Sequence, residues 1–291
     1  KKNNRILKLL NSLLVIYVTL LWAHIYKRTG KNILFPQYIQ ELTTLYRDTD
    51  MMIAVGGGYL RGKKDFGSSA ILLMLLLHPF RLARILGKPA MIYPQSVGPF
   101  GGHFQERLVA KTLKDVNLIM VREDISYQLL QRLGITKNVV RTVDSGFLFQ
   151  QKNNFKIRDK FQIPLNQMIV GITVRNWLKD LKQSVYEKEM ADFIDNIVAK
   201  YNAKVILIPQ VTTEYHKDDD RVISKRVYER VYRKHGVILI DENPSHYDVK
   251  AMYSDLDYMV GTRFHSVIFA LTGYVPSIGI EYEQKKRRPN T

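Results

Sequence analysis

Cysteine is absent from this chain of 291 residues, so it can form no disulfide and no thiolate metal site. A chain without cysteine fits a reducing compartment. The sequence also lacks a zinc knuckle, an RNA-recognition signature and a helix-turn-helix pattern, which makes nucleic acid the weaker candidate partner. Neither G-x-G-x-x-G nor a P-loop lysine and serine in register is present, so nucleotide-binding motifs are poorly supported.

Acidic residues are scarce relative to basic ones. The chain has 27 aspartates and glutamates against 44 lysines and arginines, for a formal net charge of +17. This excess favours acidic partners, such as phosphorylated metabolites, lipid-linked diphosphates or an anionic membrane surface. Hydrophobic residues make up 46% of the chain, which excludes disorder as its main state. The length suits two compact domains better than one core.

The chain starts with a basic and then an apolar segment. Residues 1–8 are rich in lysine and arginine, Leu9–Tyr26 is apolar, and Lys27 and Arg28 follow. No small-residue cleavage site follows, so we do not expect a signal peptide. We expect a helix that packs on the domain or lies on the membrane surface, in preference to a transmembrane span. The expected location is cytoplasmic, with peripheral contact to the anionic inner face of the plasma membrane.

Short apolar strands then alternate with helical segments, a pattern that predicts parallel sheets with helices on both faces. In the first half we expect strands just before Gly56 and at Pro89–Pro94, Leu118–Val121 and Val139–Val143, with helices near Ser68–Leu86 and His103–Lys114. In the second half we expect strands at Met168–Val174, Lys204–Ile208, Val237–Ile240, Tyr258–Val260 and Val275–Ile280, with helices at Val185–Tyr201, Asp218–His235 and Ser245–Ser254.

The polar and basic segment Gln150–Gln167 separates these two series and is predicted to be the interdomain linker. The sequence therefore predicts an α/β protein of two doubly wound Rossmann-like domains, 1–150 and 151–291, that face a cleft. This is the GT-B arrangement found in many sugar transferases.

Ligands of such sheets bind beyond the carboxyl ends of the strands. The candidate binding residues of the first domain lie at those ends and are Gly57, Gly58, Gln95, Ser96, Arg122 and Asp144. Two ordinary explanations stand beside this one. The glycines are as suited to a tight strand-to-loop turn as to a ligand cradle, and Arg122 can form a salt bridge with a neighbouring acid.

The segment Val260–Tyr282 is read as strand, turn, helix and strand, with Thr262 as N-cap of the helix. Arg263 and His265 then fall in the first helical turn. The helix dipole normally repels cations there, so their presence indicates an anion site. The alternatives are an ion-paired arginine and a histidine bonded to a loop carbonyl. Arg175 and Gln210 follow other strands of the same domain.

Three consecutive acids, Asp218–Asp220, invite the hypothesis of a metal site. They lie at an expected helix start beside Lys217 and Arg221, so a solvated helix terminus that matches the dipole is the preferred interpretation. No other spacing of His, Asp or Glu argues for a metal, and none is expected.

Several segments together resemble one family. GGGYL, YPQSVGPF, VRED, VDSGF, GITVRNW, VILIPQV and GTRFHSVIFALTGYVPSIGIEYEQK occur in the order and spacing of the polysaccharide pyruvyl transferases, over roughly residues 50–286. The resemblance implies a GT-B-like fold and transfer of a pyruvyl group from phosphoenolpyruvate to sugar hydroxyls, giving a pyruvate ketal on a cell-surface polysaccharide or its lipid-linked precursor. Phosphoenolpyruvate is then a co-substrate, and no cofactor is implied.

The resemblance places Arg175, Arg263 and His265 where the phosphate and carboxylate of the donor are held, and adds Glu283 and Lys285 as substrate-binding residues. It implies a donor side in residues 151–291 and an acceptor side in residues 1–150. Guanidinium groups match both acidic groups of phosphoenolpyruvate. His265 is the expected general acid or phosphate partner, and either Glu283 or Asp144 would take the hydroxyl proton. A glycosyltransferase that uses a nucleotide sugar and a non-catalytic membrane-surface scaffold are the rival interpretations.

Two departures from the family pattern stand out. Family members begin with a strand and loop rich in glycine and asparagine, which has no counterpart before residue 50, and they continue with a C-terminal helix beyond the Tyr-Glu-x-Lys segment. We therefore expect either a fragment of a longer protein or a chain without its poorly ordered segments.

Overall fold

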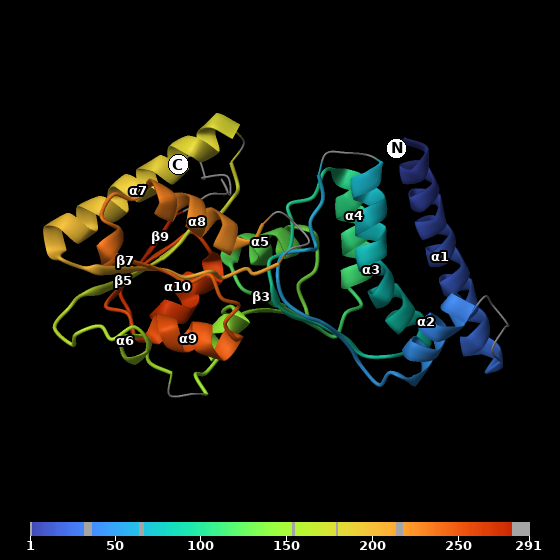
Figure 1. Cartoon of the computed structure of the whole chain (residues 1–291). Helices are drawn as coiled ribbons and strands as arrows, with labels where there is room; N and C mark the ends of the chain where they lie inside the picture. Colours follow the sequence, from blue (N-terminus) through green and yellow to red (C-terminus); the bar gives the residue numbers. More distant parts are fainter. Residues whose placement is uncertain are drawn as a thin grey trace. The chain divides into compact units, whose positions relative to one another are not determined.

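The computed structural model describes residues 2–31, 37–63, 67–152, 155–178, 180–213 and 218–280. The chain divides into two compact units, Lys1–Ser145 (unit 1) and Gly146–Thr291 (unit 2). Each unit contains one parallel sheet, of four strands in unit 1 and of five strands in unit 2 (Figure 1). The predicted α/β class with two parallel sheets is confirmed.

Unit 1 has strands in sequential order, β1-β2-β3-β4. Its strands are β1 (Met52–Ala54), β2 (Ala90–Gln95), β3 (Leu118–Val121) and β4 (Val139–Arg141). Its helices are α1 (Lys2–Thr29), α2 (Gln37–Asp48), α3 (Ser68–Leu86), α4 (His103–Leu113) and α5 (Asp124–Arg132), followed at the unit boundary by the 3-10 turn η1 (Ser145–Leu148). Helix α2 was not anticipated from the sequence.

The helices between the strands of unit 1 share one core. Leu73 and Leu77 of α3, Val109 of α4 and Leu130 of α5 pack in one cluster with strand residues such as Ile92. When the strands of a parallel sheet follow each other in one direction, the helices that connect them lie on one side of the sheet. Helices α3, α4 and α5 therefore cover one face, and the prediction of helices on both faces is not met by these three.

Helix α1 packs on α3, as one of the two favoured expectations for this segment requires. Trp22 and Ala23 of α1 form a buried cluster with Leu82 and Ile85 of α3, and Figure 1 shows α1 along the outer side of α3. Helix α3 has two apolar sides: Leu73 and Leu77 pack in the core cluster with the sheet, and Leu82 and Ile85 pack against α1. Within the described residues, Leu9–Thr29 and Ser68–Leu86 are each long and apolar enough to cross a membrane, a test that buried core helices also pass.

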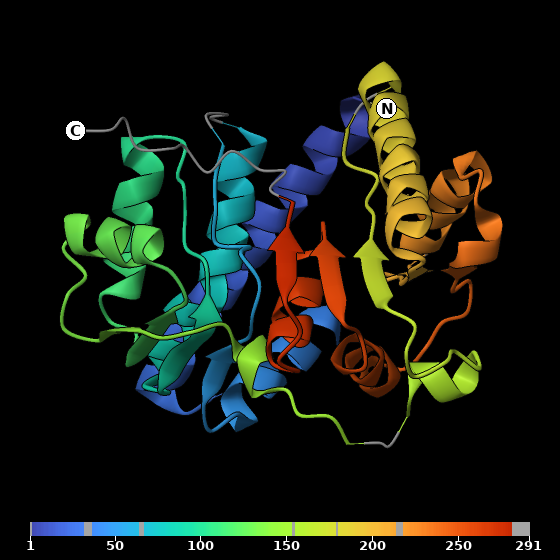
Figure 2. The ribbon, with the colours of Figure 1, turned by 90° about the vertical axis from the view of Figure 1, so that its left-hand side faces the viewer.

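Unit 2 has the strand order β7-β6-β5-β8-β9, and its strands run in one direction (Figure 2). The strands are β5 (Ile169–Thr173), β6 (Lys204–Leu207), β7 (Val237–Leu239), β8 (Tyr258–Gly261) and β9 (Ser277–Gly279). The helices are α6 (Ile157–Lys160), α7 (Asp180–Tyr201), α8 (Asp220–Arg230), the 3-10 turn η3 (Lys234–Gly236), α9 (His246–Ser254) and α10 (Phe264–Leu271).

Helices cover both faces of the unit 2 sheet. One core cluster joins the strands to α7 and α8, and another joins them to α6, α9 and α10. The expected linker Gln150–Gln167 is partly built into the second cluster, since Ile157 is fully buried there. The predicted helix Asp218–His235 is shorter than expected because Val231 has an extended backbone and ends α8.

Candidate active site

The strand order of unit 2 creates one point where the direction of winding reverses. From the central strand β5 the chain winds to β6 and β7, then returns to place β8 on the other side of β5. Ligands of open α/β sheets bind beyond the carboxyl ends of strands at such a switch point. Thr173 of β5 lies opposite Gly261 of β8, and Arg175 and Arg263 each follow two residues later.

Hydrogen bonds tie the two strand ends together. The backbone N–H of Thr262 donates to Thr173 Oγ1 at 3.0 Å, and the Thr262 hydroxyl donates to the Thr173 carbonyl at 2.8 Å. The Ser266 hydroxyl donates to the Arg263 carbonyl at 2.6 Å. The prediction of Thr262 as the N-cap was wrong: its hydroxyl is used between the strands, and Arg263 occupies the cap position.

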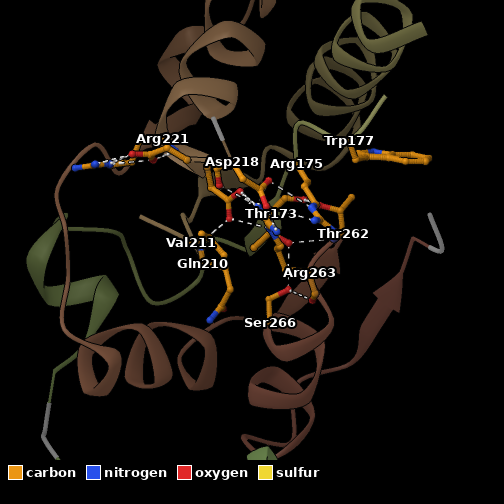
Figure 3. Close-up of polar contacts among 12 residues, drawn as sticks. Thr173, Arg175, Trp177, Gln210, Val211, Asp218, Arg221, Thr262, Arg263 and Ser266 are labelled. Atoms are coloured by element: carbon orange, nitrogen blue, oxygen red, sulfur yellow. Dashed lines mark hydrogen bonds and ion pairs between the residues drawn. The ribbon is translucent and has the colours of Figure 1, made fainter. Parts of the chain in front are cut away.

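Arg263 is a buried cation, with 7% of the residue exposed. Its Nε and Nη2 donate to Asp220 Oδ1 at 3.1 and 2.6 Å, and Nη2 also donates to Asp218 Oδ1 at 2.8 Å (Figure 3). Burial lowers the pKa of the guanidinium, but the bonds to Asp220 and Asp218 outweigh this effect and raise the pKa above its usual value. Arg263 therefore stays charged inside the fold.

Arg175 approaches the same carboxylate as Arg263. Its Nη2 lies 3.3 Å from Asp218 Oδ2, and its side chain is 23% exposed while that of Asp218 is 28% exposed. Burial raises the pKa of the Asp218 carboxyl, but Arg263 and Arg175 outweigh burial and lower the pKa overall. Asp218 thus bridges the two arginines (Figure 3). The expectation that Arg175 and Arg263 lie near each other is met.

Asp220 corrects the expectation of a solvated acidic helix start. It is 1% exposed and accepts hydrogen bonds from the backbone N–H groups of Gln210 and Val211 at 3.1 and 2.9 Å, in addition to Arg263. Burial raises the pKa of its carboxyl, despite the opposing bonds from Arg263. Asp219 caps α8 by accepting from Arg221 N at 2.9 Å, but its side chain is only 10% exposed and pairs with Arg221, so it is not solvated either. Gln210 joins this network through its backbone.

His265 is the second residue of α10 and is exposed, whereas Arg263 is buried. Its ring lies against Phe264 and Phe269, with centroids 5.6 and 6.4 Å apart. The two-residue spacing from Arg263 directs the two side chains differently, as helix geometry predicts. His265 is therefore an exposed imidazole at the start of the helix that follows the buried Arg263.

The candidate residues of unit 1 form a second cluster. Arg122 Nε donates to Ser96 Oγ at 3.0 Å, and Arg122 Nη1 donates to the carboxylate of Asp144. Ser96 Oγ also donates to Glu123 Oε2 at 3.0 Å. The ordinary alternative for Arg122, a salt bridge with a neighbouring acid, is therefore present. The guanidinium of Arg122 thus faces two carboxylates, those of Glu123 and Asp144. Carboxylate oxygens can accept hydrogen bonds from hydroxyl groups.

The glycines after β1 serve the turn. Gly57 has φ +84°, in the left-handed region that favours glycine. Its carbonyl accepts from Ser96 N at 3.1 Å, so the turn joins the loop after β2. Gly58 faces Ser96 at an ordinary contact distance of 3.5 Å from an added Cβ. Gln95 is fully buried and lies by the hydroxyl of Tyr59, whose pKa is raised by burial. A turn thus explains Gly57 without a ligand.

Glu283 and Lys285, the last two predicted residues, lie outside the described residues. Among the described residues, no group of three or more His, Cys, Asp or Glu is arranged to hold a metal ion.

Sequence reasoning missed the partners of the arginines. Asp218 and Asp220 were assigned to solvent, and Thr173 was read only as a strand residue. A signal was available: consecutive strands of a parallel sheet are commonly neighbours, so the acids at the start of α8, shortly after β6, fall at the same sheet edge as Arg175.

Comparison with known proteins decides the family. The model of the polysaccharide pyruvyl transferase family matches residues 4–284. The chain belongs to this family. The resemblance drawn from the motifs is thereby confirmed.

This pyruvyl transferase family member is 26% identical, over 270 residues, to the amylovoran biosynthesis protein AmsJ of Erwinia amylovora. The match covers 88% of this chain and 62% of AmsJ, so the chain spans less than two thirds of that relative. Among solved structures, Anabaena HepE in complex with UDP and glucose is similar at a TM-score of 0.46 and 11% identity, covering 82% of this chain and 61% of HepE.

A UDP-forming trehalose-phosphate synthase from Burkholderia xenovorans has a TM-score of 0.46 and 10% identity, covering 91% of this chain and 70% of the synthase. TM-scores below 0.5 at such identities are too low to support a conclusion about ligand or reaction.

Proposed function

We propose that this family member transfers the pyruvyl group of phosphoenolpyruvate onto two hydroxyls of a sugar and releases phosphate. The observation that carries the proposal is the pair Arg175 and Arg263, joined through Asp218 at the switch point of unit 2. Phosphoenolpyruvate has a phosphate and a carboxylate a few bonds apart, and guanidinium groups bind both kinds of oxyanion in a bidentate fashion. Two arginines that share one carboxylate suit such a dense anion.

In this proposal phosphoenolpyruvate displaces the Asp218 carboxylate from Arg175 and Arg263. Most donor groups of Arg263 are already bonded: Nε to Asp220, and Nη2 to both Asp220 and Asp218. Asp220 is buried and Asp218 is partly exposed. An incoming anion therefore competes with Asp218 for the two arginines, while Asp220 keeps Arg263 in position.

The proposed reaction begins with protonation of the methylene carbon of phosphoenolpyruvate, which leaves an oxocarbenium-like centre at C2. One sugar hydroxyl adds to C2 and loses its proton. The bond from C2 to the phosphate oxygen then breaks, a second hydroxyl forms the other ketal bond, and its proton leaves with the phosphate. The proton lost by the first hydroxyl thus balances the proton that was added to the methylene carbon.

We assign His265 as the donor of the first proton, because an imidazole can give and take a proton under physiological conditions. Its exposure, two residues after Arg263 in the chain, supports this role. The arginines stabilise the departing phosphate electrostatically. Glu283 and Asp144 stay as the two candidates for the base; Asp144 is occupied by Arg122 in this structure.

We also propose that unit 2 holds the donor and unit 1 the acceptor, a sugar or lipid-linked oligosaccharide. The acid-rich cluster of Ser96, Arg122, Glu123 and Asp144 supports an uncharged, hydroxyl-bearing ligand in unit 1. We place the protein in the cytoplasm, where phosphoenolpyruvate is made.

The test is thermal unfolding of the purified chain with phosphoenolpyruvate, UDP-glucose or GDP-mannose. A ligand at about 100 times its dissociation constant adds roughly 2.7 kcal/mol to stability. We expect phosphoenolpyruvate alone to raise the unfolding temperature, and His265→Gln to keep that increase while phosphate release with an acceptor is lost. Stabilisation by a nucleotide sugar alone would support a glycosyltransferase instead. A folded chain that responds to no donor would support a non-catalytic scaffold.

A further inference from the structure

Helix α1 has two apolar faces, and α3 covers only one of them. On the covered face, Ile16, Thr19, Trp22 and Ala23 are buried. Thr19 Oγ1 and His78 Nε2 of α3 lie 2.7 Å apart in a hydrogen bond inside this contact. The spacing of three and four residues is that of one side of a helix. This side of α1 is therefore committed to unit 1.

The opposite face of α1 carries a row of exposed apolar side chains, which we call the leucine stripe. Its members recur every three or four residues and are 45 to 67% exposed: Leu7, Leu10, Leu14, Tyr17 and Leu21. Single exposed leucines are common on protein surfaces, but a contiguous row marks a surface that contacts something apolar.

The charges around the stripe all have one sign. Helix α1 contains no Asp or Glu, and its last turn carries Lys27 and Arg28. A hollow of about 330 Å³ at its carboxyl end is lined by Lys27, Arg47 and Lys88, among others. Asp48 forms an ion pair with Arg47 at 2.6 Å, and its charge also interacts with that of Lys88. The hollow therefore keeps an excess of positive charge at the carboxyl end of α1.

We propose that the leucine stripe docks on an anionic membrane surface, with α1 lying parallel to it and α3 on the protein side. An amphipathic helix binds a bilayer when apolar side chains enter the boundary between headgroups and acyl chains and basic residues meet anionic lipids. Each lysine or arginine near such a surface strengthens binding by its attraction to the anionic lipids. The hollow with Lys27 and Lys88 is then suited to a headgroup phosphate.

Two other occupants fit less well. A second copy of α1 against the stripe would offer no opposite charge to Lys27 and Arg28, because α1 contains no Asp or Glu. A transmembrane position would require α1 to give up the contact of Trp22 and Thr19 with α3. The proposal does not depend on the reaction, since none of its residues belongs to the site in unit 2.

The test is co-sedimentation of the full chain with vesicles of phosphatidylcholine alone or mixed with phosphatidylglycerol. We expect binding to the mixed vesicles and its loss as salt is raised. The variant Leu10→Gln/Leu14→Gln is expected to bind roughly tenfold or more weakly, and Lys27→Gln/Lys88→Gln to lose the preference for phosphatidylglycerol. The matched control is Leu165→Gln/Leu181→Gln, which changes two leucines of unit 2 that are 90 and 83% exposed.

Equal binding to both kinds of vesicle, unchanged binding of the stripe variant, or no binding at all would overturn the proposal. A dimer that the stripe variant abolishes, with no vesicle binding, would assign the stripe to a second copy instead. Thermal unfolding of each variant shows whether it is folded, and the salt dependence of the unchanged chain tests the proposal even if a variant is not.

Discussion

The two arginine clusters of this member of the polysaccharide pyruvyl transferase family lie at equivalent ends of parallel strands but carry different charge balances. In unit 1, Arg122 faces Asp144 and Glu123. In unit 2, Arg263 and Arg175 share Asp218, and Asp220 supports Arg263 alone. The strand order accounts for the difference, because only in unit 2, among the described strands, does a reversal of winding place two arginine-bearing loops side by side. An anion therefore suits unit 2 better than unit 1.

The largest expected effect is a difference in stability between alanine variants of the neighbouring residues Asp220 and Asp219. Asp220→Ala leaves a buried guanidinium with one partner removed, and breaking such a pair costs about 3 to 5 kcal/mol. Asp219→Ala removes a helix cap and should cost about 1 kcal/mol. Urea unfolding followed by a probe in unit 2 measures both. Similar losses for the two variants would mean that Asp220 is not the support of Arg263.

The second prediction compares the two clusters directly. Arg263→Lys keeps the charge but loses the planar fork, so phosphoenolpyruvate affinity should fall by about 100-fold, or roughly 2.7 kcal/mol. Arg122→Lys makes the same change in unit 1 and should leave the affinity within about threefold, an effect below 0.7 kcal/mol. Titration calorimetry gives both values. A greater loss in Arg122→Lys would place the donor in unit 1.

The third prediction uses pH to distinguish the units. Burial lowers the pKa of His78, in the contact of α1 with α3, from 6.5 to about 4, with a smaller contribution from Arg81. The unfolded chain then binds a proton that folded unit 1 does not, so unit 1 loses about 1.4 kcal/mol per pH unit as pH falls from 6.5 towards 4.

Asp218 in unit 2 behaves differently. Its pKa is lowered from 3.8, so the stability that it contributes is present above pH 3.8 and is lost only below it. Unfolding followed separately in each unit should show the first acid-induced loss in unit 1. His78→Gln keeps a hydrogen-bonding group for Thr19 and should remove that slope. If the stability of unit 1 still depends on pH in His78→Gln, another group causes that dependence.

The smallest expected effect is on phosphoenolpyruvate affinity, which should change in opposite directions in asparagine variants of Asp218 and Asp220. Asp218→Asn removes a partly exposed competitor from the arginines and should tighten phosphoenolpyruvate binding by about two- to fivefold, the size of a surface ion pair. Asp220→Asn weakens the support of Arg263 and should weaken binding. Competition with inorganic phosphate checks both. Weaker binding in Asp218→Asn would make Asp218 a positioning residue rather than a competitor.

Much of this structure follows from the sequence alone. The alternation of apolar strands with helices determined the α/β class, and the bounds of α3 and β3 agree with expectation, because burial of short apolar runs leaves few alternatives. The motifs determined the family and selected Arg175, Arg263 and His265. The sequence also shows that α1 has no acidic residue to balance Lys27 and Arg28 in its last turn.

Only the tertiary structure decided which charges are buried and which partners they have. Asp218, Asp219 and Asp220 are identical in type and adjacent in sequence, yet one bridges two arginines, one caps α8 and one is buried beneath Arg263. Their roles differ because β8, more than thirty residues later in the chain, brings Arg263 to the edge where α8 begins. A local sequence pattern contains no information about that neighbour, and the free energy of a buried charge depends on it more than on any local preference.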